Sequence, residues 1–159
     1  MANIVIHLKP AHISMGPTGF VVYARDFLNA YKFYKIDKPF SPAKYYLVCR
    51  SVELSLKSYL SLKKVDIDKL KRNYGHDLSK IYKKAVELGI TEVVDINHEE
   101  AVEIEKANKW YCRKGFEYFG IQNIVESKDT LPDLEILLHL AERSIEILKP
   151  ICLASAQKP

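Results

Sequence analysis

The sequence contains few of the residues that mark several common protein classes. Its three cysteines, Cys49, Cys112 and Cys152, are odd in number, far apart and never spaced as Cys-x-x-Cys. This pattern argues against a disulfide framework or a zinc cluster and fits a reducing compartment, so we predict a cytoplasmic protein. No uninterrupted run of about 18 apolar residues is present, which argues against a membrane span. The N-terminal segment also lacks the basic lead-in and the long apolar stretch of a signal peptide.

Motifs for catalysis and cofactor binding are equally scarce. With only six glycines, the chain contains no phosphate-binding glycine loop, and no Ser/His/Asp order or pair of acids stands out. One expected helix face carries a row of ionisable side chains at a spacing that could suit a metal, but such a row is more typical of a solvated face. We therefore predict no metal and no cofactor. The residues of this row are Glu135, His139, Glu142 and Glu146.

The balance of charged residues excludes few classes of protein. A charged content of 28% and a hydrophobic content of 48% are ordinary for a soluble globular domain. The net charge of +4 permits contact with a polyanion without implying one, because nucleic-acid binders are better recognised by a concentrated basic patch.

Helical periodicity, by contrast, runs through most of the chain. Apolar residues recur at helical spacing over about 18–36, 41–62, 77–88, 97–114 and 133–150, and Pro150 is expected to end the last helix. Short connections and the lack of a convincing strand predict an all-α, up-and-down antiparallel bundle of four to five helices. We expect an irregular N-terminal arm at 1–17, the bundle at 18–150 and a tail at 151–159.

The segment Ser41–Leu62 is expected to be the central helix, because it is apolar on two sides and has an N-cap serine followed by a proline. Between its apolar sides, four ionisable residues stack along one line. This ionisable stripe could bind a phosphate or a nucleotide, with an arginine that grips two oxygens at once. It could equally be an internal ion-pair ladder or a solvated groove. Its members are Tyr46, Arg50, Glu53 and Lys57.

A second candidate lies at the start of the next helix, where His76 and Asp77 follow Gly75. Backbone N–H groups at a helix start favour anions, and a histidine can carry a proton near neutral pH. The simpler interpretation is that His76 or Asp77 caps the helix while Gly75 makes the turn. Arg72 nearby favours the anion interpretation slightly.

A third candidate is Lys109–Phe116, which interleaves basic and aromatic residues. Rings can stack on bases while cations contact phosphates, as in single-strand binding. Such aromatic residues more often belong to the core or to a dimer interface, with the lysines and arginines in solvent around them.

Three stretches follow one another in the chain: FSPAKYYLVCRSVELSLKSYL, GHDLSKIYKKAVELGI and ANKWYCRKGFEYFG. In this order they resemble the HEPN domain (higher eukaryotes and prokaryotes nucleotide-binding) over about 18–148. The most specific parts are the E-L-x-L-K pattern of Glu53–Lys57 and the G-H-D-L start of Gly75–Leu78. The resemblance implies an up-and-down bundle of four or five helices that often pairs into a homodimer.

The same resemblance implies a choice of functions. Many members are similar to ribonucleases and toxins that carry an arginine and, a short fixed spacing later, a histidine on one helix. None of the five arginines here has a histidine at that spacing, and the nearest pair, Arg72 and His76, is one residue short. We therefore expect binding of a nucleotide, an RNA or a partner protein. One alternative is a metal-independent ribonuclease of a toxin–antitoxin pair, with a degenerate motif and His76 as general base. Another is a structural partner of a nucleotidyltransferase.

These arguments converge on one set of candidate residues. The central helix contributes two phosphate-binding cations and a carboxylate that orients them, and the following turn contributes the rest. The candidate phosphate-binding residues are Arg50, Glu53, Lys57, Arg72 and Asp77, and His76 is the candidate catalytic residue, as the proton carrier.

Overall fold

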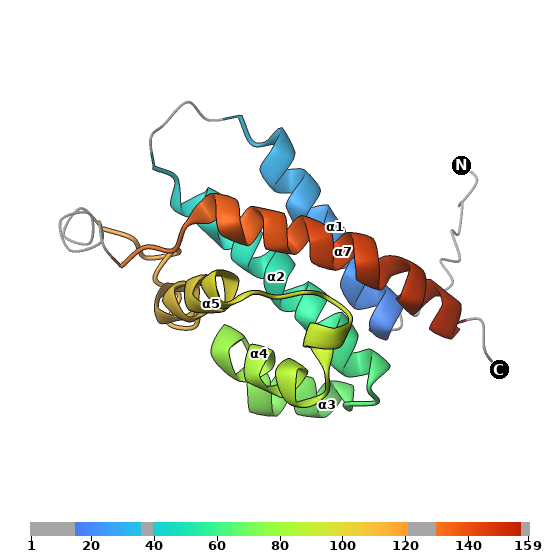
Figure 1. Ribbon diagram of the computed structural model, residues 1–159. Helices are drawn as coiled ribbons and strands as arrows, with labels where there is room; N and C mark the ends of the chain where they lie inside the picture. The colour runs from blue at the N-terminus through green and yellow to red at the C-terminus, as the bar shows by residue number, and fades with distance from the viewer. Residues whose placement is uncertain (1–14, 36–39, 121–129, 157–159) are drawn as a thin grey trace, which may run out of the picture.

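The computed structural model describes residues 15–35, 40–120 and 130–156, and every regular element in these ranges is helical (Figure 1). The predicted all-α class is therefore confirmed, and no strand occurs in the described ranges. Short helical turns, α3 (Ile67–Lys69), the π-helical η1 (Leu70–Tyr74) and the 3-10 turn η2 (Ile90–Glu92), lie within the connections. The longer helices are α1 (Pro17–Phe33), α2 (Pro42–Leu62), α4 (Leu78–Glu87), α5 (His98–Tyr111) and α7 (Leu134–Ala156).

The long helices pack as an up-and-down bundle (Figure 1). Contacts between α1 and α7 pair the start of one with the end of the other. The Thr18 hydroxyl donates to the Cys152 carbonyl at 3.1 Å, and Lys32 forms an ion pair with Glu142 at 2.6 Å. The residue number thus rises along α1 while it falls along α7, as in antiparallel neighbours. Within the described residues, no helix is both long and apolar enough to cross a membrane.

Buried carboxylates fix α5 against α7. Glu100 closes a capping box with Asn97 at the start of α5 and also accepts two hydrogen bonds from Arg143 at 2.7 Å. Further along α5, Glu103 accepts from the backbone N–H of Asp133, just before α7 begins, at 2.7 Å. Both carboxylates are almost fully buried. Because a buried carboxylate is costly unless it is paired, these contacts specify how the two helices align.

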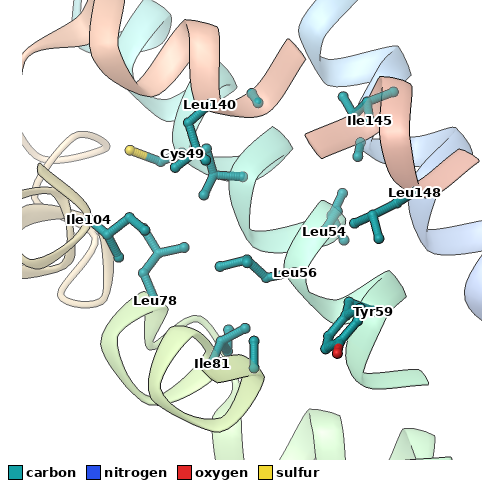
Figure 2. Close-up of a cluster of buried hydrophobic side chains, with 14 of the residues drawn as sticks. Cys49, Leu54, Leu56, Tyr59, Leu78, Ile81, Ile104, Leu140, Ile145 and Leu148 are labelled. Atoms are coloured by element: carbon teal, nitrogen blue, oxygen red, sulfur yellow. The ribbon is translucent and has the colours of Figure 1, made fainter. Parts of the chain in front are cut away.

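The helix α2 is central, as predicted: every residue from Ser51 to Leu60 is buried, and α2 contacts α1, α4, α5 and α7. Small residues lie where α2 meets α1, and the Ser51 hydroxyl donates to the Ala24 carbonyl of α1 at 2.8 Å. Figure 2 shows Leu54 of α2 facing Leu148 of α7. The core therefore surrounds α2 on most sides.

Two expectations about the helices were wrong. Pro150 does not end the last helix, which continues to Ala156, so the predicted tail begins too early. Pro150 is exposed, so the carbonyl that loses its helical partner lies on a solvated face, while Cys152 beyond it is buried. In α1 the buried residues are Phe20, Val21, Ala24 and Leu28, whereas Phe27 and the tyrosines, which the helical spacing also placed in the core, are only half-buried.

The expected N-terminal arm falls mostly on residues 1–14, which lie outside the described residues. Of the remainder, Pro17 already forms the first turn of α1. The residue suits this position because the missing N–H of a proline would be unpaired there in any case.

Candidate functional site

The structure brings the ionisable stripe of α2 against the turn before α4 and the end of α5. Glu53 lies at the centre, and its side chain is fully buried. Its carboxylate accepts hydrogen bonds from Arg50 Nη1 at 3.0 Å and from Lys57 Nζ at 2.7 Å. The Tyr111 hydroxyl donates to Oε2 at 2.6 Å, and Nδ1 of His76 lies 3.0 Å from the same oxygen. We call these five residues the Glu53 network.

Gly75 shapes the turn that delivers His76 to this network. Its φ of +50° and ψ of −119° form a combination that residues with a Cβ rarely adopt. In this conformation the Gly75 carbonyl accepts a hydrogen bond from Lys57 Nζ. A Cβ on Gly75 would meet nothing closer than the Lys71 carbonyl at 3.9 Å. The backbone conformation, not a lack of space, therefore requires glycine here.

The network holds Glu53 in its charged form. Burial by itself raises the pKa of this carboxyl group. The hydrogen bond with His76 and the charges of Lys57 and Arg50 outweigh this effect and lower the pKa to about 2. At neutral pH the centre of the bundle thus contains a fully paired carboxylate. A buried charge is tolerated only with such pairing, so this part of the stripe is the internal ion-pair ladder that was one of the sequence-based alternatives.

Tyr111 belongs to the Glu53 network although it was not among the candidate site residues. It was expected only to face the core, and its ring is indeed buried. Burial and the adjacent charge of Glu53 raise the pKa of its hydroxyl, which therefore stays protonated and donates. One signal in the sequence could have identified it: a tyrosine on a core face needs a polar partner, and Glu53 on the central helix was available.

The network has a buried part and an open part. Lys57 is almost fully buried beside Glu53, whereas the Arg50 side chain is 24% exposed and the His76 side chain is 59% exposed. Nη1 of Arg50 lies 2.9 Å from Nδ1 of His76, so an arginine and a histidine meet at the surface although they come from different elements. The half-buried ring of Tyr46, one turn before Arg50, lies 5.8 Å from that of Tyr111.

The other two candidate residues lie outside the network. Asp77 is the N-cap of α4: it accepts from the Lys80 backbone N–H at 3.0 Å and from the Asn108 side chain at 3.1 Å. These contacts match the capping interpretation, and together with Lys80 they lower the pKa of Asp77 despite the opposing effect of burial. Arg72 is exposed in η1 and forms no ion pair with any described residue. It adds positive charge to the turn that contains His76.

The basic and aromatic stretch near the end of α5 divides into an inner and an outer set. Trp110 packs against Phe116 and Phe119, with ring centroids 6.3 and 5.4 Å apart, and Phe116 is buried. Arg113 and Lys114 are exposed. This arrangement fits the core interpretation better than a stacking surface for bases, because the rings are occupied with one another.

The acidic row on α7 does not assemble into a metal-binding cluster. His139 lies 3.7 Å from Glu142, which already pairs with Lys32 of α1. Within the described ranges, no group of three or more His, Cys, Asp or Glu side chains is placed to hold a metal ion.

Comparison with known proteins adds no relative: no family model, no curated protein and no solved structure matches this chain. The resemblance to the HEPN domain therefore stays a prediction. The functional argument rests on the geometry of the Glu53 network.

Proposed function

We propose that the protein binds the phosphate of a nucleotide or of a single-stranded RNA at the open part of the Glu53 network. The observation that carries this proposal is the division of the network. Its carboxylate is buried and fully paired, while Arg50 and His76 face solvent above it. A phosphate would contact the cation without competing for the position that Glu53 already fills.

The charge of the network supports an anionic ligand. Arg50 and Lys57 are positive, and Glu53 alone is negative, so one positive charge is left over even when His76 is neutral. Burial alone would lower the pKa of Arg50, but Glu53 and Tyr111 raise it, so the guanidinium stays charged. A charged group held by a protein scaffold attracts a phosphate more strongly than a free side chain does, because less freedom is lost on binding.

The hydrogen bonds of Arg50 support the same ligand. Its hydrogen bonds to the two Glu53 oxygens and its contact with His76 all use Nη1. Among the described residues, the buried Nε of Arg50 has no hydrogen-bond partner. Arginine presents its donors in a planar fork that matches two phosphate oxygens, so Nε would gain a partner if the guanidinium turned toward such a group.

A ribonuclease is the second candidate, favoured by the 2.9 Å contact between Arg50 and His76. In the tautomer whose Nδ1–H donates to Glu53, Nε2 of His76 is bare and can accept the proton of a ribose 2′-hydroxyl. The 2′-oxygen would then attack the adjacent phosphorus, and Arg50 would stabilise the charge that develops on the phosphoryl oxygens. Cleavage of an RNA, and loss of cleavage in His76→Asn with binding retained, would identify this activity.

The binding proposal is tested by thermal unfolding with and without AMP, ATP and a short oligouridylate. A ligand present at 100 times its Kd stabilises the folded protein by about 2.7 kcal/mol, which is visible as a higher Tm. We expect one of these ligands to raise the Tm of the wild-type protein. We expect no rise in a folded Arg50→Ala variant.

Arg25→Ala is the matched control, because it removes the same charge from α1, where Arg25 borders a cavity formed with Glu142 and Glu146. This variant should respond to the ligand as the wild-type protein does. If no ligand shifts the wild-type Tm, or if both variants lose the shift alike, the proposal is wrong. The network would then serve folding, and a partner protein would become the leading function.

A further inference from the structure

We propose that His76 gates this anion site by taking up a proton, which moves the Nδ1 hydrogen bond from Arg50 to Glu53 and releases Arg50 to the ligand. This inference rests on the proposed function, since it names the regulation of the same site. It follows from a conflict around a single atom. Nδ1 of His76 lies 2.9 Å from a donor, Arg50 Nη1, and 3.0 Å from an acceptor, Glu53 Oε2.

The two contacts cannot both be favourable. A bare Nδ1 accepts a hydrogen bond from Arg50 but directs its lone pair at the Glu53 carboxylate. A protonated Nδ1 donates to Glu53 but directs its N–H at the N–H groups of Arg50. In the neutral imidazole with its hydrogen on Nε2, the bare Nδ1 is held by Arg50, and the added proton creates the Nδ1–H that is held by Glu53 instead.

Arg50 has room for a second position. Its side chain is 24% exposed, and its guanidinium lies over the Phe27 ring with 5.7 Å between Cζ and the ring centroid. Its buried Nε has no partner in the described part of the chain, so the present position leaves a donor unsatisfied. Repulsion from a protonated His76 would move the guanidinium outward, where Nε and Nη2 face an anion together.

The charges around His76 favour anion binding when His76 is protonated. From α2 it faces Arg50 and Glu53, with Lys57 on the far side of the carboxylate. From α5 it faces the Tyr111 ring edge-on at 6.2 Å. On its own segment Arg72 is exposed, and Asp77 is occupied as the cap of α4. Protonation adds a second net positive charge to the Glu53 network, which a bound phosphate would neutralise.

The test measures oligouridylate affinity by fluorescence anisotropy between about pH 5 and 8, where histidine commonly titrates. Neither the phosphodiester nor uracil changes its charge in this range. Because binding and proton uptake are linked reciprocally, we expect the Kd to rise with pH by up to about tenfold per unit in the wild-type protein. His76→Asn, which cannot become charged, should bind with a Kd that does not depend on pH.

His139→Asn is the matched control, since His139 is an exposed histidine on α7, and it should keep the wild-type pH dependence. A second readout needs no ligand: the NMR signal of the Arg50 Nε–H should shift with pH in step with the His76 imidazole, and should stay constant in His76→Asn. Binding without pH dependence would overturn the gate and leave the proposed function intact. A pH-dependent Kd with an unchanged Arg50 signal would also overturn it, because His76 would then act through its charge alone. Absence of oligouridylate binding at every pH would overturn the gate together with the proposed binding of single-stranded RNA.

Discussion

Replacement of Glu53 by glutamine tests whether the network is built around a buried charge. Glu53→Gln keeps the shape of the side chain and removes only its charge. Arg50 and the buried Lys57 would then face each other without the carboxylate that pairs them. The donors around the position would also meet an amide, which itself carries two N–H donors.

The structure sets the magnitude of the effect. The pKa of Glu53 falls from an ordinary value of 4.5 to about 2 in the folded protein. At about 1.4 kcal/mol per pH unit, this difference corresponds to roughly 3 kcal/mol of stability at neutral pH. The loss of one partner from a buried pair costs a similar amount, about 3–5 kcal/mol. We therefore expect Glu53→Gln to lower the free energy of unfolding by about 3–5 kcal/mol at pH 7.

The sign of the pH dependence follows from the direction of the pKa change. A carboxyl group whose pKa is lower in the folded state stabilises the protein above its unfolded pKa. This stabilisation is lost as the pH falls through the folded value. The difference between wild type and Glu53→Gln should be full above about pH 5 and should fall to about half near pH 3, midway between the two pKa values.

Urea unfolding followed by circular dichroism at several pH values measures this difference. Glu105→Gln is the matched control, because Glu105 is 44% exposed and pairs with Lys83 at the surface. Glu105→Gln should lower the free energy of unfolding by less than about 1 kcal/mol. A loss below about 1 kcal/mol for Glu53→Gln, or a loss that does not change with pH, would show that the network does not depend on a buried charge at this position.

Three further substitutions test single contacts, each by the change in the free energy of unfolding measured from the urea midpoint. Tyr111→Phe removes the hydroxyl that donates to Glu53 at 2.6 Å and should lower this free energy by about 1.5–3 kcal/mol. No measurable loss would exclude a strong hydrogen bond there. Gly75→Ala forces a Cβ onto a φ of +50° and should cost about 1–3 kcal/mol, whereas a neutral effect would show that the turn relaxes freely. Pro150→Ala restores a helical N–H in α7 and should stabilise the protein by up to about 3 kcal/mol; destabilisation would show that the proline is required.

Helical periodicity predicted the part of the site that lies on one element. Arg50, Glu53 and Lys57 are three and four residues apart, so their alignment along α2 follows from the geometry of a helix alone. Whether that line was buried depended on which elements cover it, and this is a property of the whole bundle. His76 and Tyr111 reach Glu53 from positions 23 and 58 residues away, and no local pattern encodes that meeting.

The fold was predictable from the sequence to a similar extent. Apolar spacing located the five long helices and the central role of α2, because amphipathic faces must be buried against one another. The end of α7 was not predictable from Pro150, since packing of Cys152 and its bond with Thr18 extend the helix past a residue that locally disfavours it. The homodimer, the nucleotidyltransferase partner and the toxin–antitoxin role stay predictions from the resemblance.

Binding of a phosphate at the open part of the Glu53 network would place the ligand next to His76. The most direct measurement is an NMR correlation spectrum of the histidine imidazoles during a titration with oligouridylate. His98 and His139 serve as internal references, since both are exposed on other helices. We expect the His76 signals to shift until they saturate, while those of His98 and His139 stay constant. An unchanged His76 signal while the oligonucleotide binds elsewhere would contradict binding at the Glu53 network.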